Sequence, residues 1–276
     1  MQTGTFYIFD TDIKPVSDLA NENLSPEVDI YEVIRVQNQV PLFLENHLER
    51  LKRSFQVAGK PIWLSLEEIS SRINTLIQQN QIANGNIKLD FLFYKTSTKH
   101  FIAYFVPAKY PKSEDYTKGI VCNLFHAERP NPTAKIYNPK LRGTTNNIIE
   151  NQHVYETLLV DHNNLITEGS RSNVFFIIDN QLYTAPDELV LNGVIRKKVI
   201  ELTKKLNIPL NYTSLPETDI KKVQAAFITG TSPRILPIRQ INHLTLDAIH
   251  PVMQQLMEGL NQLINNYIDN NRNTTN

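Results

Sequence analysis

Residues 163–176 read NNLITEGSRSNVFF, and the fold class can be inferred from this run and the residues around it. Its pattern predicts a hairpin, with a first strand over residues 155–160, a turn over 161–164 and a second strand over 165–178. Glu168 is a lone carboxylate in the apolar second strand, and small residues follow it. A buried carboxylate needs a cationic partner or takes up a proton. The simpler alternative is a glutamate at a strand end that faces water.

The composition is that of an ordinary soluble protein. The 276 residues include 28 basic and 28 acidic side chains, so the formal net charge is zero and indicates neither nucleic acid nor a membrane surface as a partner. Cys122 is the single cysteine, and His126, His153 and His162 lack ligand spacing, so we expect no metal site. Neither a membrane-spanning apolar run nor a secretory pattern occurs, and we therefore expect a cytoplasmic protein.

The order of predicted elements indicates an α/β protein with two domains. Residues 107–119 contain two prolines, several charges and no apolar period, which is typical of a linker. We place a smaller N-terminal α/β domain at residues 1–110, the linker at 111–119 and a larger C-terminal domain at 120–276.

Amphipathic helices are predicted in both domains. Residues 45–57 form one of them, with His47, Arg50 and Ser54 on a face of their own. Its apolar stripe consists of Leu44, Leu48, Leu51 and Phe55. In the C-terminal domain, helices are predicted over residues 138–153, 194–206 and 247–267. The stripe of the second of these consists of Ile195, Val199, Leu202 and Leu206.

Together these features resemble the class IV, or fold type IV, pyridoxal-phosphate enzymes, the family of branched-chain and D-amino-acid aminotransferases and aminodeoxychorismate lyase. The resemblance runs from about Tyr31 to Ile238, and the order and spacing of its motifs carry it. It implies a D-amino-acid aminotransferase-like fold of two domains, a homodimer, and pyridoxal 5'-phosphate bound by the C-terminal domain. It also implies that Glu168 pairs with the pyridine nitrogen of that cofactor.

Lys135 resembles the family's cofactor-binding lysine. The run Lys135-Ile136-Tyr137-Asn138, followed after a helix by Tyr155-Glu156-Thr157, matches the family's order without a gap. If Lys140 were the matching lysine instead, the helix that follows it would be shorter than in the family and the family's asparagine would be missing. Alternatively, Lys135 is a solvated lysine at the end of a strand. As the catalytic residue, Lys135 must lose its proton to attack, which burial favours, and it then acts as general base and acid.

Three places resemble the family's phosphate site. Arg50 lies in a run similar to the signature His-x-x-Arg-Leu and can donate two parallel hydrogen bonds. Val194 and Ile195 open a helix whose free N–H groups attract an anion, although Ile195 replaces the family's usual threonine. Thr231 lies in a run similar to the family's Gly-Thr loop.

Several cations surround these predicted sites. Arg196, Lys197 and Lys198 crowd the first turn of the helix that Val194 opens, where they oppose its dipole. Either a bound anion compensates these charges or the side chains point outward. Arg171 and Arg234 are further cations near the predicted site.

Fewer residues of this sequence resemble the family's substrate-binding residues than resemble its phosphate-binding residues. Tyr31 resembles the aromatic residue that lines the family's substrate site, and Thr231 and Ser232 offer backbone donors for a carboxylate. The family's Gly-Asp-Gly before this aromatic residue is absent. Its arginine near residues 87–94 is absent as well, which leaves Lys88 or Lys95.

The resemblance implies amino transfer between an amino acid, apolar and branched-chain-like or of D configuration, and a 2-oxo acid. β-Elimination of the aminodeoxychorismate lyase type could use the same site and stays open. A class IV scaffold that has lost catalysis and only binds a ligand or partner is a third hypothesis. The presence of Lys135, Glu168 and Arg50 argues against that third hypothesis.

Overall fold

The computed structural model describes residues 4–22, 24–107 and 110–272. By its contacts the chain divides into two compact units. Unit 1 comprises residues 1–109, 134–137 and 264–276, and unit 2 comprises residues 110–133 and 138–263. The short segment that contains Lys135 therefore belongs with the N-terminal part of the chain. The domain limits drawn from the sequence stay a prediction.

Unit 1 is built on an antiparallel sheet of six strands. Its longest strands, β3 and β5, pair over ten residues in one continuous register. The strand order is β2-β1-β6-β5-β3-β4, with β1 at Phe6–Phe9, β2 at Asp12–Pro15, β3 at Val28–Gln37, β4 at Val40–Pro41, β5 at Asn84–Phe93 and β6 at Lys99–Val106.

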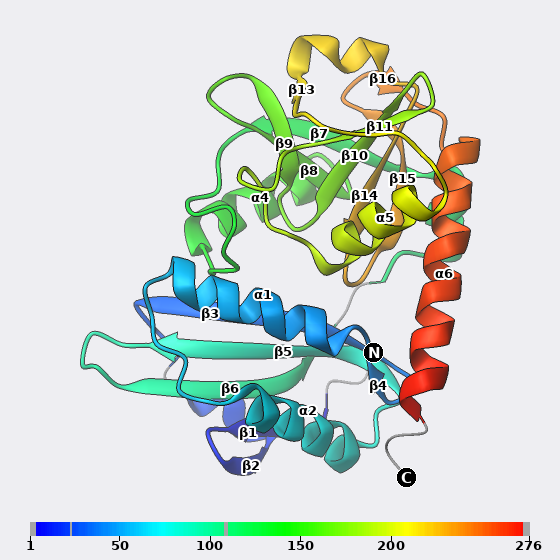
Figure 1. The fold of residues 1–276 in the computed structure, drawn as a ribbon. Coiled ribbons are helices and arrows are strands. Elements are labelled where there is room, and N and C mark those ends of the chain that lie inside the picture. Colours follow the sequence, from blue (N-terminus) through cyan, green and yellow to red (C-terminus); the bar gives the residue numbers. More distant parts are fainter. Residues whose placement is uncertain (1–3, 23, 108–109, 273–276) are drawn as a thin grey trace. The chain divides into compact units, whose positions relative to one another are not determined.

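Two helices pack against one face of this sheet. Figure 1 shows α1 (Leu44–Val57) lying along β3, and α2 (Leu66–Asn80) packs on β1 and β6. A 3-10 helix, η1, spans Val16–Asn21. The apolar stripe predicted for residues 45–57 is confirmed, because α1 buries Leu48, Leu51 and Phe55 in the core of unit 1.

Unit 2 contains a closed ring of strands. Neighbours pair in the order β10-β14-β15-β7-β8-β9, and β9 pairs back with β10. Side chains of alternate residues fill the ring with an apolar core, as in a small barrel. The ring strands are β7 (Ile120–His126), β8 (Glu156–Val160), β9 (Leu165–Gly169), β10 (Asn173–Ile178), β14 (Ala225–Gly230) and β15 (Arg234–Ile241).

The second strand of the predicted hairpin differs from expectation. Residues 165–178 do not form one strand, because the chain turns at Ser170–Ser172 and separates β9 from β10. The two strands then pair with each other antiparallel through Glu168 and Asn173. The break thus closes the ring of strands at Glu168, a long-range arrangement that a local apolar pattern cannot reveal.

The remaining elements of unit 2 extend or cover the ring. Further strands are β11 (Gln181–Thr184), β12 (Leu210–Tyr212), β13 (Leu215–Pro216) and β16 (Leu244–Thr245). The helices are α3 (Ser113–Lys118), α4 (Pro139–Asn151), α5 (Val194–Lys205), η2 (Glu217–Lys222) and α6 (Pro251–Arg272), which passes into unit 1 at Ile264. Figure 1 shows α5 against β14.

Three predicted segments need correction. The linker contains the short helix α3, because Asp115 caps it through the backbone N–H of Lys112. Leu206 lies beyond the end of α5 and is exposed, since the buried side of α5 is carried by Val199 and Leu202. The last helix begins at Pro251 and continues to Arg272.

Candidate functional site

Lys135 is held in a short extended segment at the free edge of β3. Its carbonyl accepts a hydrogen bond from the Tyr31 N–H at 3.1 Å, and the N–H of Tyr137 donates to the Asp29 carbonyl at 2.9 Å. The Lys135 N–H donates to Ser54 Oγ of α1 at 2.9 Å. Lys135 Nζ lies 4.5 Å from the centre of the Tyr31 ring. Two predicted site residues of unit 1 are therefore in contact.

The competing lysine has a different environment. Lys140 lies in the first turn of α4, in unit 2, and is exposed. Lys135 is half-buried, and its main chain is bonded to β3 and α1. A catalytic lysine must be held in a defined position, and a fixed main chain provides this because it limits the positions that the side chain can reach.

The polar face of α1 is buried against Glu32 of β3. Arg50 donates from Nε to Glu32 Oε1 at 2.8 Å and from Nη2 to Oε2 at 2.7 Å. His47 Nδ1 lies 2.9 Å from the same Oε2. Because an ionised carboxylate only accepts hydrogen bonds, His47 Nδ1 is the donor in this contact. In the described part of the chain, Arg50 Nη1 forms no hydrogen bond.

Burial and charge shift the acid–base properties of this group in opposite directions. Burial alone would raise the pKa of the Glu32 carboxyl, but the charge and hydrogen bonds of Arg50, together with the His47 hydrogen bond, lower that pKa to about 2. Burial lowers the pKa of His47, and the charges of Arg50 and Lys135 act in the same direction, whereas Glu32 opposes them. The group therefore contains an ionised carboxylate, a guanidinium and a neutral imidazole.

Glu168 is buried at the closure of the ring in unit 2. Its side chain is 2% exposed, which excludes the alternative of a strand-end glutamate in water. Arg129 Nε lies 3.0 Å from Glu168 Oε1 as an ion pair. Glu168 Oε2 accepts from the Leu191 N–H at 3.2 Å and from Asn173 Nδ2 at 3.4 Å. Sequence reasoning missed the role of Arg129, which lies thirty-nine residues earlier in a proline-rich turn.

Asn173 connects three elements of the candidate site. Its backbone pairs with Glu168 on one side and with Thr229 of β14 on the other. Its Nδ2 also donates to the Leu191 carbonyl at 2.8 Å. At Gly193, the residue before α5, an added Cβ would collide with Asn173 Oδ1. Asn173 thus holds Glu168, β14 and the start of α5 together, a role that the sequence analysis did not assign.

The start of α5 is buried and lacks a side-chain cap. Gly193 provides no side-chain hydrogen bond, and Val194 and Ile195 in the first turn are both buried. Backbone N–H groups at a helix start need partners, and an anion is a suitable one. Close by in the sheet, the hydroxyl of buried Thr229 has no hydrogen-bond partner among the described residues.

Arg196 follows neither of the two alternatives predicted for it. Its side chain is 2% exposed, so it does not point outward. Nor does it need a bound anion, because Nη1 donates to Asp187 Oδ1 at 2.6 Å and Nη2 donates to the Ala185 carbonyl at 2.7 Å. Lys198 pairs with Glu201 at 3.1 Å. The charges of Arg196 and Lys198 are therefore both compensated by acidic side chains of the protein.

The turn between β14 and β15 contains Thr231 and Ser232, both half-buried. Arg234 ends this turn with a φ of 58° and donates from Nη1 to Asn261 Oδ1 at 3.1 Å. Arg171 donates from Nη2 to Asn146 Oδ1. Both arginines thus have protein partners.

A second buried carboxylate shapes the break between β9 and β10. Glu156 Oε1 accepts from Ser170 Oγ at 2.6 Å, and Oε2 accepts from Ser172 Oγ at 2.9 Å and from the Arg171 N–H at 3.3 Å. The chain between the two strands therefore wraps around Glu156. This arrangement fixes the turn that brings Asn173 beside Glu168.

The donor set of unit 2 fits pyridoxal phosphate. That cofactor has a ring nitrogen that is cationic when protonated and a phosphate that is anionic. Unit 2 offers a buried carboxylate at Glu168 and, joined to it through Asn173, an uncapped helix start at Val194 and Ile195. One site thus contains an acceptor for the cation and donors for the anion.

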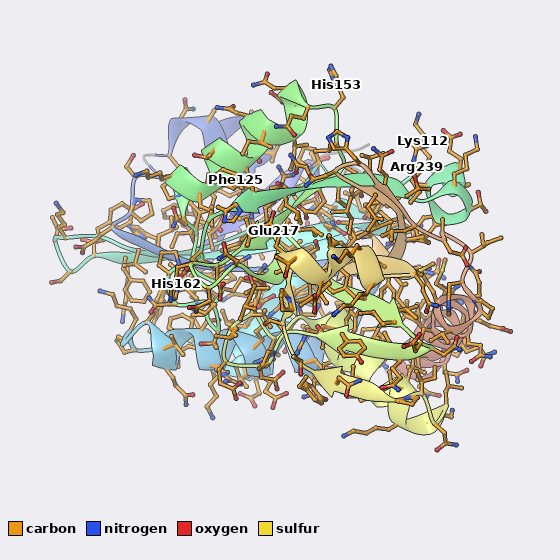
Figure 2. The ribbon with its side chains drawn as sticks, turned by 90° about the horizontal axis from the view of Figure 1, so that it is seen from above. Lys112, Phe125, His153, His162, Glu217 and Arg239 are labelled. Carbon is orange, nitrogen blue, oxygen red and sulfur yellow. The ribbon has the colours of Figure 1, made fainter. Side chains whose placement is uncertain are left out.

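The described residues give less support to a metal site or to a helix that spans a membrane. Within residues 4–22, 24–107 and 110–272, histidine, cysteine, aspartate and glutamate nowhere gather in threes to hold a metal ion. Figure 2 shows His153 beyond the end of α4 and His162 at the β8–β9 turn, apart from each other. Over the same residues, each helix is too short or too polar to span a bilayer.

Sequence comparison identifies the family. The profile of the family described as amino-transferase class IV matches residues 29–241. D-alanine aminotransferase of Bacillus licheniformis is 25% identical over 242 residues, which cover 80% of this chain and 82% of that protein. A probable branched-chain-amino-acid aminotransferase of Thermotoga maritima is 26% identical over 247 residues, covering 87% and 88%.

Solved structures share the fold. The branched-chain amino acid aminotransferase of Escherichia coli superposes with a TM-score of 0.86 at 19% identity, covering 95% of each chain. The T.th. branched-chain amino acid aminotransferase with pyridoxamine 5'-phosphate gives 0.84 at 19% identity, covering 96% of this chain and 95% of the other. A putative 4-amino-4-deoxychorismate lyase of Legionella pneumophila gives 0.77 at 21% identity, covering 85% and 90%.

Fold and site thus define a protein of fold type IV. The chain belongs to the class IV aminotransferase family, whose members are pyridoxal-phosphate-dependent enzymes. The fold and family expected from the sequence are confirmed.

Proposed function

We propose that this protein is an aminotransferase that moves an amino group between an amino acid with an apolar side chain, branched-chain-like or of D configuration, and a 2-oxo acid. Its family and the two sequence relatives named above support amino transfer as the reaction. We also propose that it acts in the cytoplasm. We further propose that it is a homodimer, because the family resemblance implies that assembly.

The observation that carries the proposal is the connection of Glu168 to the start of α5 through Asn173. A carboxylate and a set of helix N–H groups, both buried and joined by one side chain, suit a ligand with a cationic and an anionic end. In the proposed site, Glu168 pairs with the ring nitrogen. Val194, Ile195 and Thr231 hold the phosphate through N–H and hydroxyl groups.

Lys135 is the proposed catalytic residue. When bound, pyridoxal phosphate stabilises the negative charge that develops on the α-carbon of an amino acid after proton loss. Lys135 would hold the aldehyde carbon of the cofactor in the resting enzyme and would be released when the amino group of the substrate takes its place. Its neutral Nζ would then take the proton from the α-carbon and deliver it to the former aldehyde carbon. Its neighbour Tyr31 lines the substrate side, and the backbone of Thr231 and Ser232 donates to the substrate carboxylate.

Arg50 is proposed as a further phosphate ligand. Its Nε and Nη2 are engaged with Glu32, so Nη1 is the atom that remains for a phosphate oxygen. The Glu32 contact fixes the guanidinium plane, which reduces the conformational entropy lost when an anion binds. Glu32 is therefore a proposed positioning residue for Arg50.

A spectroscopic assay tests the proposed reaction. The yellow holoenzyme should lose its colour when leucine, valine, D-alanine or L-alanine is added, and a 2-oxo acid should restore it. Lys135→Ala should bind cofactor more weakly and show no such conversion. If the colour never changes while aminodeoxychorismate yields pyruvate, elimination is the reaction, a result that the fold shared with the putative lyase allows. If the protein binds no cofactor, the scaffold hypothesis is correct.

A further inference from the structure

One face of the unit 1 sheet carries a group of charged side chains beside Lys135. In the antiparallel register, Tyr31 of β3 stands opposite Asp90 of β5, and Lys88 of β5 stands opposite Tyr104 of β6. Side chains at paired positions point to the same side of a sheet, and alternate residues of a strand do so as well. These four side chains therefore share one face.

The segment that contains Lys135 extends this face. Ile136 bridges to Ile30 of β3, and both pack in the core beneath α1 and α2. Since successive side chains along a strand point to opposite sides, Lys135 and Tyr137 project away from that core, with Tyr31. The contact of Lys135 Nζ with the Tyr31 ring agrees with this direction.

Lys88 is enclosed by aromatic rings and is already paired. Its Nζ lies 2.7 Å from Asp90 Oδ1, and it lies 5.3 Å from the ring centre of Tyr31, 5.7 Å from that of Tyr137 and 6.0 Å from that of Tyr104. The Asp90 side chain is 5% exposed. Burial alone would lower the pKa of Lys88, but Asp90, Tyr104 and Asp29 raise it above its ordinary value, so Lys88 stays charged.

Asp29 adds a second carboxyl group to this face. Burial and the negative charge of Asp90 raise the pKa of Asp29 to about 8, while Lys88 works against that shift. At neutral pH the group formed by Lys88, Asp90 and Asp29 therefore carries one positive and one negative charge, with Asp29 protonated. We call these three residues the Lys88 cluster.

The Lys88 cluster lies within reach of a substrate that reacts at Lys135. Both Lys135 and Lys88 place their Nζ atoms over the same Tyr31 ring. In an extended five-carbon 2-oxo acid, the second carboxylate lies about 5 Å from the reacting carbon, from bond lengths of about 1.5 Å. A substrate chain running along the Tyr31 ring therefore brings its distal end to this cluster.

We propose that the Lys88 cluster is a specificity determinant that disfavours a second carboxylate and selects amino and 2-oxo acids with a single carboxylate. This proposal rests on the proposed aminotransferase function. A distal carboxylate can gain Lys88 only by displacing Asp90, which would leave a buried carboxylate unpaired. An apolar distal group displaces nothing and packs against the tyrosine rings.

The test compares two acceptors of similar size, 2-oxoglutarate and the uncharged-tail analogue 2-oxohexanoate. The holoenzyme in its amino form should use 2-oxohexanoate with a kcat/KM about tenfold or more above that for 2-oxoglutarate. The double substitution Asp29→Asn/Asp90→Asn keeps both side-chain shapes and leaves Lys88 uncompensated, because Asp29 would ionise beside Lys88 if Asp90 alone were neutralised. The preference of this variant should shift toward 2-oxoglutarate by about tenfold. Asp12→Asn, an exposed aspartate of β2, should leave the ratio unchanged.

Two results would overturn the proposal. The first is a preference of the wild-type enzyme for 2-oxoglutarate. The second is an unchanged ratio in the folded double variant Asp29→Asn/Asp90→Asn. Equilibrium binding of the same two acids to the holoenzyme, measured by calorimetry, gives the same comparison without turnover. Failure of amino transfer with both acids, together with tighter binding of 2-oxohexanoate, would reject the proposed reaction while supporting the Lys88 cluster. Tighter binding of 2-oxoglutarate would reject the cluster.

Discussion

Arg50 of α1 and Glu32 of β3 form a buried ion pair with two parallel hydrogen bonds. The pair joins the helix to the strand that carries Tyr31. Removing one partner of such a pair leaves the other charge buried and uncompensated. We therefore expect Arg50 to contribute to the stability of the fold, in addition to its proposed role in binding phosphate.

Arg50→Ala should lower the free energy of unfolding of the cofactor-free protein by about 3–5 kcal/mol, because Glu32 is left buried without its guanidinium. Arg53→Ala removes an exposed arginine from the same helix and should change it by less than about 0.5 kcal/mol. Denaturant unfolding measures both. Equal effects of the two substitutions would show that the Glu32 contact contributes little.

Asn173→Ala should weaken cofactor binding and cost about 1–3 kcal/mol of stability, because the buried Leu191 carbonyl and Glu168 lose a donor. Asn151→Ala, at the exposed end of α4, is the matched control and should be near neutral. Cofactor titration and thermal unfolding test this expectation. Normal cofactor affinity in Asn173→Ala would contradict the role given to Asn173.

Asp29 makes stability depend on pH in an unusual direction. Its pKa is about 8 in the folded protein, against an ordinary 3.8, because of burial and Asp90. Between these values the folded state binds more protons than the unfolded state, so stability falls as the pH rises across this window. Asp29→Asn cannot ionise and should gain stability relative to wild type as the pH rises from about 4 to about 8.

Thermal unfolding at several pH values provides the measurement for Asp29. The difference in melting temperature between Asp29→Asn and wild type should grow with pH. Asp12→Asn, at an exposed position, should show a difference that does not change with pH. A pH-independent difference for Asp29→Asn would mean that Asp29 is ionised in the folded protein throughout this range.

Glu168→Gln should retain the cofactor but slow the proton-transfer step, because an amide does not hold the ring nitrogen protonated. The substitution keeps the side-chain shape but removes the carboxylate that pairs with Arg129, so circular dichroism should first establish that the variant is folded. Stopped-flow absorbance after mixing with amino acid measures the step. Normal turnover by Glu168→Gln would show that Glu168 is not the partner of the ring nitrogen.

Local sequence signals predict some parts of this structure well. The spacing Ser65-x-x-Glu68 is a signal for the start of a helix, and at the start of α2 each of these side chains accepts a hydrogen bond from the backbone N–H of the other residue. The spacing of His47, Arg50 and Ser54 also correctly groups them on one face of α1. In both cases the relevant residues lie within two helical turns of each other, so spacing alone relates them.

Long-range relationships escape the same reasoning. The ion pair between Arg129 and Glu168 depends on how distant segments meet in unit 2. The break at Ser170–Ser172 depends on Glu156 of a neighbouring strand, which binds the two serine hydroxyls. The pairing of Arg50 with Glu32 likewise joins a helix to a strand. Apolar periodicity contains no information about such polar partners.

Chemical labelling of the cofactor-binding lysine tests the role proposed for Lys135. The holoenzyme should be reduced with borohydride, digested, and its peptides analysed by mass spectrometry. We expect a pyridoxyl group on the peptide that contains Lys135, its loss in Lys135→Arg, and full labelling in Lys140→Arg. A label on Lys140 or on another lysine, with Lys135 unmodified, would contradict this expectation.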